Sequence, residues 1–136
     1  MMKKKVFPVL VIAALLLAAC NGCSSFSKTT YSSLGTAAIA VNSTMLALDD
    51  LYQRGYLSET AKDKIVSVHE KYRIAHRAAV TALENYVNAK GDEKADLKKE
   101  IELQLGVVTG LVAELNRMLA EYEAKAPKTN SVTEGE

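Results

Sequence analysis

The sequence predicts an all-α protein, an extended antiparallel bundle of three helices in an up-down-up arrangement. Three long segments, residues 32–54, 59–90 and 93–125, carry apolar side chains at alternating steps of three and four. This spacing is typical of a helix that buries one face. The chain has only two prolines, Pro8 and Pro127, and no alternating strand pattern. Short connections between the three segments favour antiparallel neighbours.

A basic and then apolar leader precedes the predicted bundle. Residues 1–5 include three lysines, and residues 6–19 form an apolar run that only Pro8 interrupts. This order is typical of a secretory signal peptide. The run is also shorter than the roughly 20 residues that a membrane-spanning helix needs. We therefore expect residues 1–19 to be a cleaved signal peptide.

The end of this leader, Leu17-Ala18-Ala19-Cys20, resembles the lipobox of bacterial lipoproteins. The resemblance covers residues 1–20 and no part of the bundle. It implies that the Cys20 thiol receives a diacylglycerol and that cleavage makes Cys20 the first residue, whose amino group is often acylated too. Two or more acyl chains hold a protein firmly on a membrane. The alternative is a plain secretory signal, or an N-terminal membrane helix, with an unrelated cysteine.

The resemblance also implies a location. The protein would be lipid-anchored in the cell membrane or outer membrane, with its domain in the periplasm or otherwise outside the cytoplasmic membrane. Asn21 follows the cysteine where enteric lipoproteins retained in the inner membrane carry aspartate, which favours the outer membrane. No cofactor is expected apart from the covalent lipid on Cys20.

Polar segments flank the predicted bundle. Residues 20–31 are rich in Ser, Thr, Asn and Gly, so we expect a lipidated cysteine followed by a flexible tether. Lipidation would leave Cys23 either as a free or capped thiol or in a disulfide between two copies. Residues 126–136, with Pro127 near their start, are expected to be a disordered tail.

Each predicted helix has its own end signals. Gly55 can adopt left-handed geometry and ends the first helix. Ser58 is the expected cap of the second helix, Gly91 ends that helix, and Asp92 is the expected cap of the third. The stripes that we expect to be buried are Leu34, Ala38, Val41, Met45, Leu48 and Tyr52 in the first helix, Ala61, Ile65, Val68, Tyr72, Ala75, Ala79, Ala82 and Tyr86 in the second, and Leu97, Ile101, Val108, Leu111, Leu115, Met118 and Tyr122 in the third, with Leu105, Val112 and Leu119 beside them.

Two surfaces are predicted to lack a neighbour. The first helix is the shortest, so the tip of the hairpin between the other two, at about residues 83–101, would have no third helix. Alternatively, the first helix begins near Ser27 and covers part of this tip. The candidate contact residues at the tip are Leu83, Tyr86, Val87, Leu97 and Ile101.

The second surface lies within residues 103–112, which are apolar nearly all round and contain Gly106 and Gly110. A helix of this kind needs neighbours on more than one side, and small residues four apart allow close helix packing. This favours contact with a second copy or with another protein. The alternative is that the two glycines relieve crowding inside a monomer.

No catalytic or metal site is predicted. His69 and His76 lie seven residues apart, about 10 Å along a helix, which is too far for one metal ion. A zinc pair on a helix uses a spacing of three or four. Neither a catalytic signature nor a glycine-rich phosphate loop occurs in the sequence. We expect two histidines at the core boundary and no enzyme; an enzyme that uses His69 or His76 is the weakest alternative.

The charge balance limits the partners. Removing Lys3, Lys4 and Lys5 with the leader leaves 14 of the 17 basic residues against 16 acidic ones. This excess of acidic residues argues against nucleic-acid binding. The sequence thus favours an envelope lipoprotein with a structural or interaction role, held on the membrane by lipid and bound to a second copy or an envelope protein. The alternative is a periplasmic carrier of a small apolar ligand in the bundle core.

Overall fold

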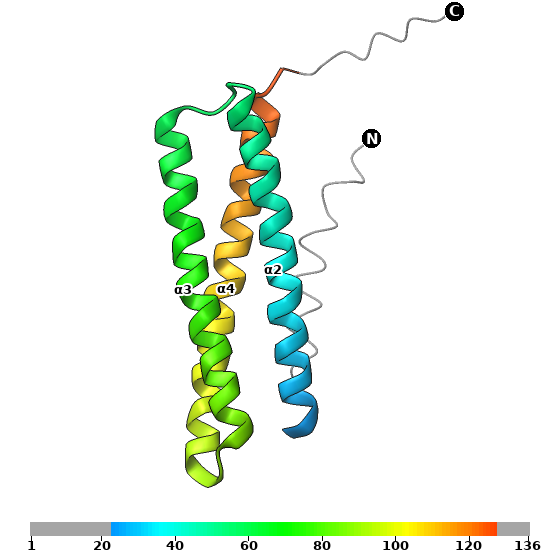
Figure 1. The fold of residues 1–136 in the computed structure, drawn as a ribbon, viewed down its shortest axis with the longest axis vertical. Helices are drawn as coiled ribbons and strands as arrows, with labels where there is room; N and C mark the ends of the chain where they lie inside the picture. Colours follow the sequence, from blue (N-terminus) through cyan, green and yellow to red (C-terminus); the bar gives the residue numbers. More distant parts are fainter. Residues whose placement is uncertain (1–22, 128–136) are drawn as a thin grey trace, which may run out of the picture.

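The structure, a computed structural model, describes residues 23–127, which form three helices and no strand. These are α2 (Cys23–Gln53), α3 (Glu59–Asn88) and α4 (Gly91–Lys125). The helices lie side by side and run up, down and up (Figure 1). This confirms the predicted all-α three-helix bundle. None of the helices in the described range is long and apolar enough to cross a membrane.

The start of α2 corrects the predicted boundary of the first helix. This helix begins at Cys23 rather than at about residue 32, so the tether predicted over residues 20–31 is wrong for residues 23–31. Phe26, Thr30 and Leu34 recur at steps of four on one side of α2 and are all buried. Their burial against the other helices outweighs the loop-like Ser and Thr composition around them.

The turn after α2 uses the backbone freedom of glycine. Gly55 has a φ of +80°, and its N–H donates to the Tyr52 carbonyl over 2.9 Å. The Tyr56 N–H donates to the Leu51 carbonyl, also over 2.9 Å. These two bonds form the Schellman motif, which satisfies the last carbonyls of a helix. The prediction that Gly55 ends the first helix is confirmed.

Replacing Gly55 by alanine is expected to lower the free energy of unfolding by about 1–2 kcal/mol, because the added Cβ crowds the next carbonyl in left-handed geometry. Gly35→Ala is the matched control, since Gly35 lies inside α2 with ordinary φ and open space around a Cβ. This control should stabilise the protein by up to about 1 kcal/mol. Urea unfolding followed by circular dichroism measures both changes. A stabilisation at both positions would contradict the left-handed turn.

The start of α3 is as predicted, whereas the connection to α4 lies two residues earlier in the chain than predicted. Ser58 Oγ accepts a hydrogen bond from the Ala61 N–H over 3.1 Å and caps α3. The helix ends at Asn88, and α4 begins at Gly91 with Lys90 at the cap position. The predictions that Gly91 ends the second helix and that Asp92 caps the third are therefore both wrong, because Gly91 is the first residue of α4. This aspartate lies in the first turn instead, where its charge suits the positive end of the helix dipole.

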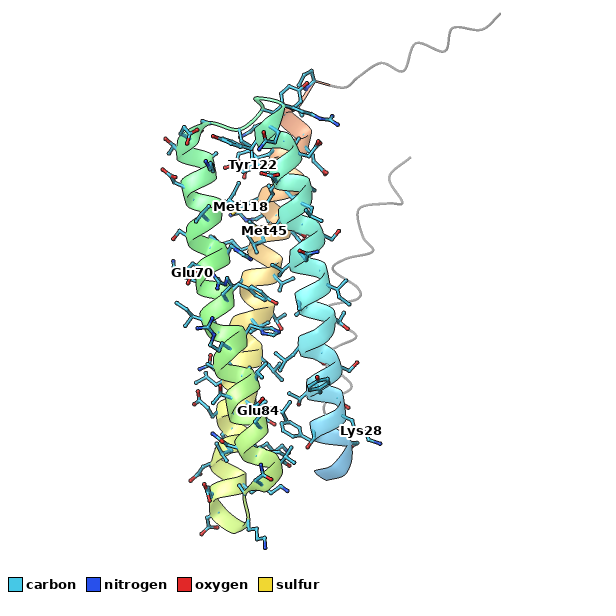
Figure 2. All side chains as sticks on the ribbon, in the orientation of Figure 1. Lys28, Met45, Glu70, Glu84, Met118 and Tyr122 are labelled. Atoms are coloured by element: carbon cyan, nitrogen blue, oxygen red, sulfur yellow. The ribbon has the colours of Figure 1, made fainter. Side chains whose placement is uncertain are left out.

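The core consists of two clusters along the bundle. One lies at the end near Gly55 and draws side chains from all three helices, including Leu48, Tyr72 and Leu115. Figure 2 shows Met45 and Met118 between the helices at this end. The other cluster lies at the hairpin end, around Phe26, Tyr86 and Ile101. Most of the predicted stripe residues are buried or half-buried, but Ala38 is exposed, because α2 packs mainly on α4 and less on α3.

Candidate functional site

The hairpin tip is partly covered by α2, so of the predicted contact residues there only Val87 stays well exposed, at 58%. Leu83, Tyr86 and Ile101 are at most 5% exposed, and Leu97 is half-buried. The Phe26 ring lies edge-on to the Tyr86 ring with 5.1 Å between centroids. The expectation that the tip lacks a third helix is therefore wrong. The alternative is correct, because the earlier start of α2 places its first turns against the tip.

Gly106 and Gly110 lie on an exposed side of α4. A Cβ added at either glycine would meet nothing within 4 Å. The alternative that they relieve crowding inside a monomer is therefore wrong. Leu103 and Val107 beside them are 62% and 45% exposed. We call these four residues the α4 face; residues 103–113 around it contain no charged side chain.

A second uncharged surface lies on the outer side of α2. Ile39 and Leu46 are seven residues apart, so they share one side of the helix, and both are well exposed. Residues 29–48 contain no Asp, Glu, Lys or Arg. The solvent side of a helix usually carries charged residues. Our reading of the sequence missed this surface, although the absence of charge over residues 29–48 is a signal that could have found it.

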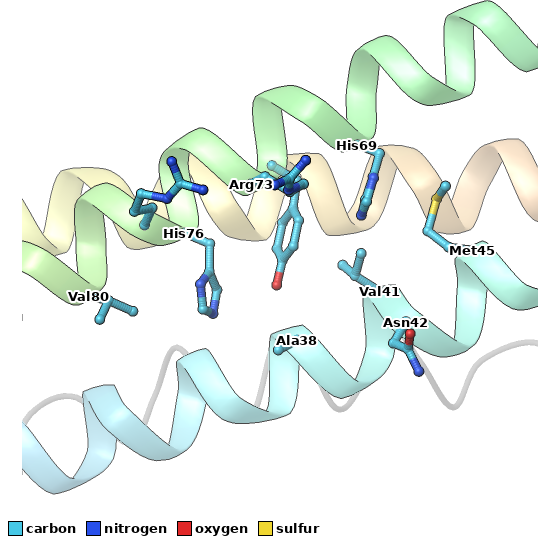
Figure 3. A pocket seen from close by; sticks show the side chains of 10 residues that line it. Ala38, Val41, Asn42, Met45, His69, Arg73, His76 and Val80 are labelled. Carbon is cyan, nitrogen blue, oxygen red and sulfur yellow. The ribbon is translucent and has the colours of Figure 1, made fainter.

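A groove runs between α2 and α3, on the side where α2 leans away towards α4. It contains two hollows that adjoin at Val80, which lines both. The middle hollow has a volume of about 570 Å³, and its lining includes Ala38, Val41, Met45, His69 and His76. In Figure 3, the two histidines project from α3 towards the α2 side chains of this hollow. We call this feature the α2–α3 groove.

The second hollow of the α2–α3 groove lies towards the start of α2. Its volume is about 750 Å³. Tyr31, Leu83 and Val87 give it an apolar lining, and Lys28 and Glu84 supply one charge of each sign. Tyr31 and Val87 are exposed, so the apolar surface of this hollow is open to solvent. We call it the end hollow.

Tyr72 is the least satisfied polar side chain of the groove. It lines the middle hollow and is only 5% exposed, and its hydroxyl has no hydrogen-bond partner among the described residues. Burial raises the pKa of this hydroxyl above its usual value of 10.0, so the group stays a protonated donor. The rings of His69 and His76 lie on either side, with centroids 6.2 Å and 5.5 Å from that of Tyr72.

The two histidines lie at the core boundary, as expected, and both are half-buried. His76 Nε2 is 3.1 Å from the Leu34 carbonyl oxygen. A carbonyl can only accept, so Nε2 carries the proton and donates across the groove to α2. Among residues 23–127, no three His, Cys, Asp or Glu side chains are placed to share a metal ion.

The middle hollow contains positive charge and no carboxylate. Arg73 and Arg77 both line it, whereas no Asp or Glu does. Arg73 also forms an ion pair with Glu70 at the surface, with 3.1 Å between Nη1 and Oε2. Arg77 has no such pair among the described ion pairs. Arginine guanidinium groups suit carboxylate and phosphate oxygens.

The predicted lipidation site, Cys20, lies outside the described residues, as do the predicted signal peptide at 1–19 and residues 128–136 of the predicted tail. The described chain begins three residues after Cys20, because α2 starts at Cys23. No family model, curated protein sequence or solved structure matches this chain significantly.

Proposed function

We propose that this protein is a lipid-anchored lipoprotein of the bacterial cell envelope with a structural or protein-interaction role. The lipobox-like residues ending at Cys20 support the anchor. The α4 face supports the interaction role, and one observation carries it. Gly106 and Gly110 lie inside a helix with no intramolecular neighbour, although each costs that helix about 1 kcal/mol relative to alanine.

The α4 face has the composition of a helix-docking surface. Glycines four apart let a second helix approach closely, and Leu103 and Val107 supply apolar contact area. Charged residues border the face at both ends, for example Glu102 and Glu114. An uncharged centre with a polar border is typical of protein interfaces. We infer that the face receives a helix of an envelope protein or of a second copy.

The early start of α2 supports a position of the bundle close to the membrane. Cys23 follows Cys20 by three residues, which span at most about 10 Å when fully extended. A partner of the α4 face would therefore also lie near the bilayer. Loss of the anchor should remove the contact, because the two proteins would no longer be held in the same layer.

The test is crosslinking in intact cells with a photoreactive residue at Val107. We expect a discrete adduct that disappears in the Cys20→Ala variant. A photoreactive residue at Ser67, which is exposed on α3, is the matched control and should give no such adduct. The absence of any adduct at Val107, together with a monomeric protein, would contradict the proposal.

Two alanine substitutions separate docking from folding. Gly106→Ala with Gly110→Ala should stabilise the bundle by about 1 kcal/mol at each position and reduce the Val107 adduct several-fold, because the added methyl groups push the partner helix away. Gly35→Ala adds a methyl group to a helix-interior glycine of α2 and should leave the adduct unchanged. An undiminished adduct in the double variant would show that the glycines are not the contact.

A further inference from the structure

The α2–α3 groove is a separate surface from the α4 face, and its lining points to a ligand rather than to a helix. The middle hollow is apolar along α2, where Ala38, Val41 and Met45 line it. The polar groups from α3 include Arg73 and Arg77, which are cationic donors. A guest of this hollow therefore combines apolar surface with a hydrogen-bond acceptor, and negative charge makes it complementary.

Tyr72 identifies the position of that acceptor. A buried hydroxyl without a partner costs about 1–3 kcal/mol, so native structures rarely retain one without a reason. The Tyr72 hydroxyl is in this state on the wall of the middle hollow. The nearby His76 uses its Nε2–H for the Leu34 carbonyl, so this N–H does not compete for the guest.

The end hollow extends the same groove with apolar surface. Val80 joins it to the middle hollow, and Leu83 and Val87 continue along α3. From Tyr72 to Val87 the helix rises about 22 Å. This is the length of an extended long alkyl chain. The charges of the end hollow, Lys28 and Glu84, are opposite in sign, so the apolar chain meets no net charge there.

We propose that the α2–α3 groove binds a long-chain amphiphile with one alkyl chain and an anionic head, of the carboxylate or phosphate type. The head lies in the middle hollow, where it accepts a hydrogen bond from Tyr72 and faces Arg77. The chain passes Val80 and ends against Tyr31 and Val87. This inference does not depend on the docking role, because the groove and the α4 face use different residues.

The site differs from the apolar-ligand carrier expected from the sequence. That carrier would hold its guest in the bundle core, but Ala79, Ile101 and Leu115 are each 0% exposed there and closely packed. The groove borders the core, since Val41 and Tyr72 of the core cluster line the middle hollow. Binding therefore needs only a local opening between α2 and α3 at the buried Tyr72 hydroxyl and the His76–Leu34 hydrogen bond, and the rest of the core stays packed. The free hydroxyl and the guanidinium groups also select for a charged head, which an apolar carrier would not.

The test uses photoaffinity labelling of the full chain in phosphatidylcholine vesicles. The probe is hexadecanoate with a diazirine near the end of its chain, and mass spectrometry locates the adduct. We expect adducts at Tyr31, Leu83 or Val87. Unlabelled hexadecanoate or hexadecyl phosphate should compete at least about tenfold better than hexadecan-1-ol. The anion that competes at the lower concentration shows whether the site prefers a carboxylate or a phosphate head group.

Two substitutions with matched controls test the residues. Tyr72→Phe should raise about tenfold the concentration of unlabelled hexadecanoate that halves the labelling, whereas Tyr56→Phe, outside the groove, should not. Val80→Trp fills the joint between the hollows and should abolish labelling, whereas Ile74→Trp on the exposed side of α3 should not. Equal competition by the alcohol, adducts spread outside the groove, or unchanged binding by Tyr72→Phe would each overturn the proposal.

Discussion

Replacing Leu115 by alanine is expected to lower the free energy of unfolding by about 2–5 kcal/mol. Leu115 is 0% exposed and belongs to the core cluster that all three helices build. Its truncation removes apolar contacts and leaves a cavity that rigid helices close only partly. A loss of this size is a large fraction of the stability of a small domain. Urea unfolding followed by far-ultraviolet circular dichroism measures it.

The matched control is Leu103→Ala, on the same helix. Leu103 is 62% exposed, so its truncation should change the free energy of unfolding by no more than about 0.5 kcal/mol. The difference between the two variants tests which side of α4 faces the core. Equal losses would show that α4 is rotated about its axis. They would also remove the basis for treating the α4 face as a free surface.

Replacing Phe26 by alanine is expected to cost about 3 kcal/mol or more. Phe26 is 3% exposed, and its ring contacts Tyr86 edge-on in the hairpin-end cluster. The Lys98 ammonium also lies 5.1 Å from the ring centroid. These contacts hold the first turns of α2 on the tip. Their loss should expose the hairpin end to faster hydrogen exchange as well as lowering the free energy of unfolding.

Tyr31→Ala is the control for this change, because Tyr31 is an aromatic residue of α2 that is 74% exposed. It should cost the bundle little stability. A flexible tether over residues 23–31 predicts a different result, in which Phe26→Ala is also nearly neutral. Protection from hydrogen exchange around Leu83 and Tyr86 should fall in Phe26→Ala and stay unchanged in Tyr31→Ala. Unchanged protection in both variants would show that α2 does not cover the tip, as expected from the sequence.

The chain's periodicity was enough to predict the class of fold and most helix ends. Apolar residues at steps of three and four are a local signal, and they identify a helix whatever it packs against. Gly55 and Ser58 are also local signals, because backbone geometry and a side-chain cap act within a few residues. This is why their roles could be predicted from the residues around them.

The start of α2 shows where local signals fail. Ser and Thr around Phe26 are typical of a loop, and burial against distant segments, including the contact of Phe26 with Tyr86, favours the helix here. The same contact buries the tip residues that we expected to be exposed. Burial depends on which distant segment arrives at a surface, and no pattern within one helix contains that information.

The candidate sites also depend partly on local sequence signals and partly on tertiary packing. Residue spacing identified Gly106 and Gly110 as a pair, but only the open space around them shows that they face away from the bundle. The isolation of the Tyr72 hydroxyl and the hollows beside Val80 depend on the lateral shift of α2 towards α4. The sequence by itself determined three amphipathic helices and the turn at Gly55, because these are short-range features. Only the tertiary structure decided which apolar surfaces are covered, because that depends on how the helices lie against one another.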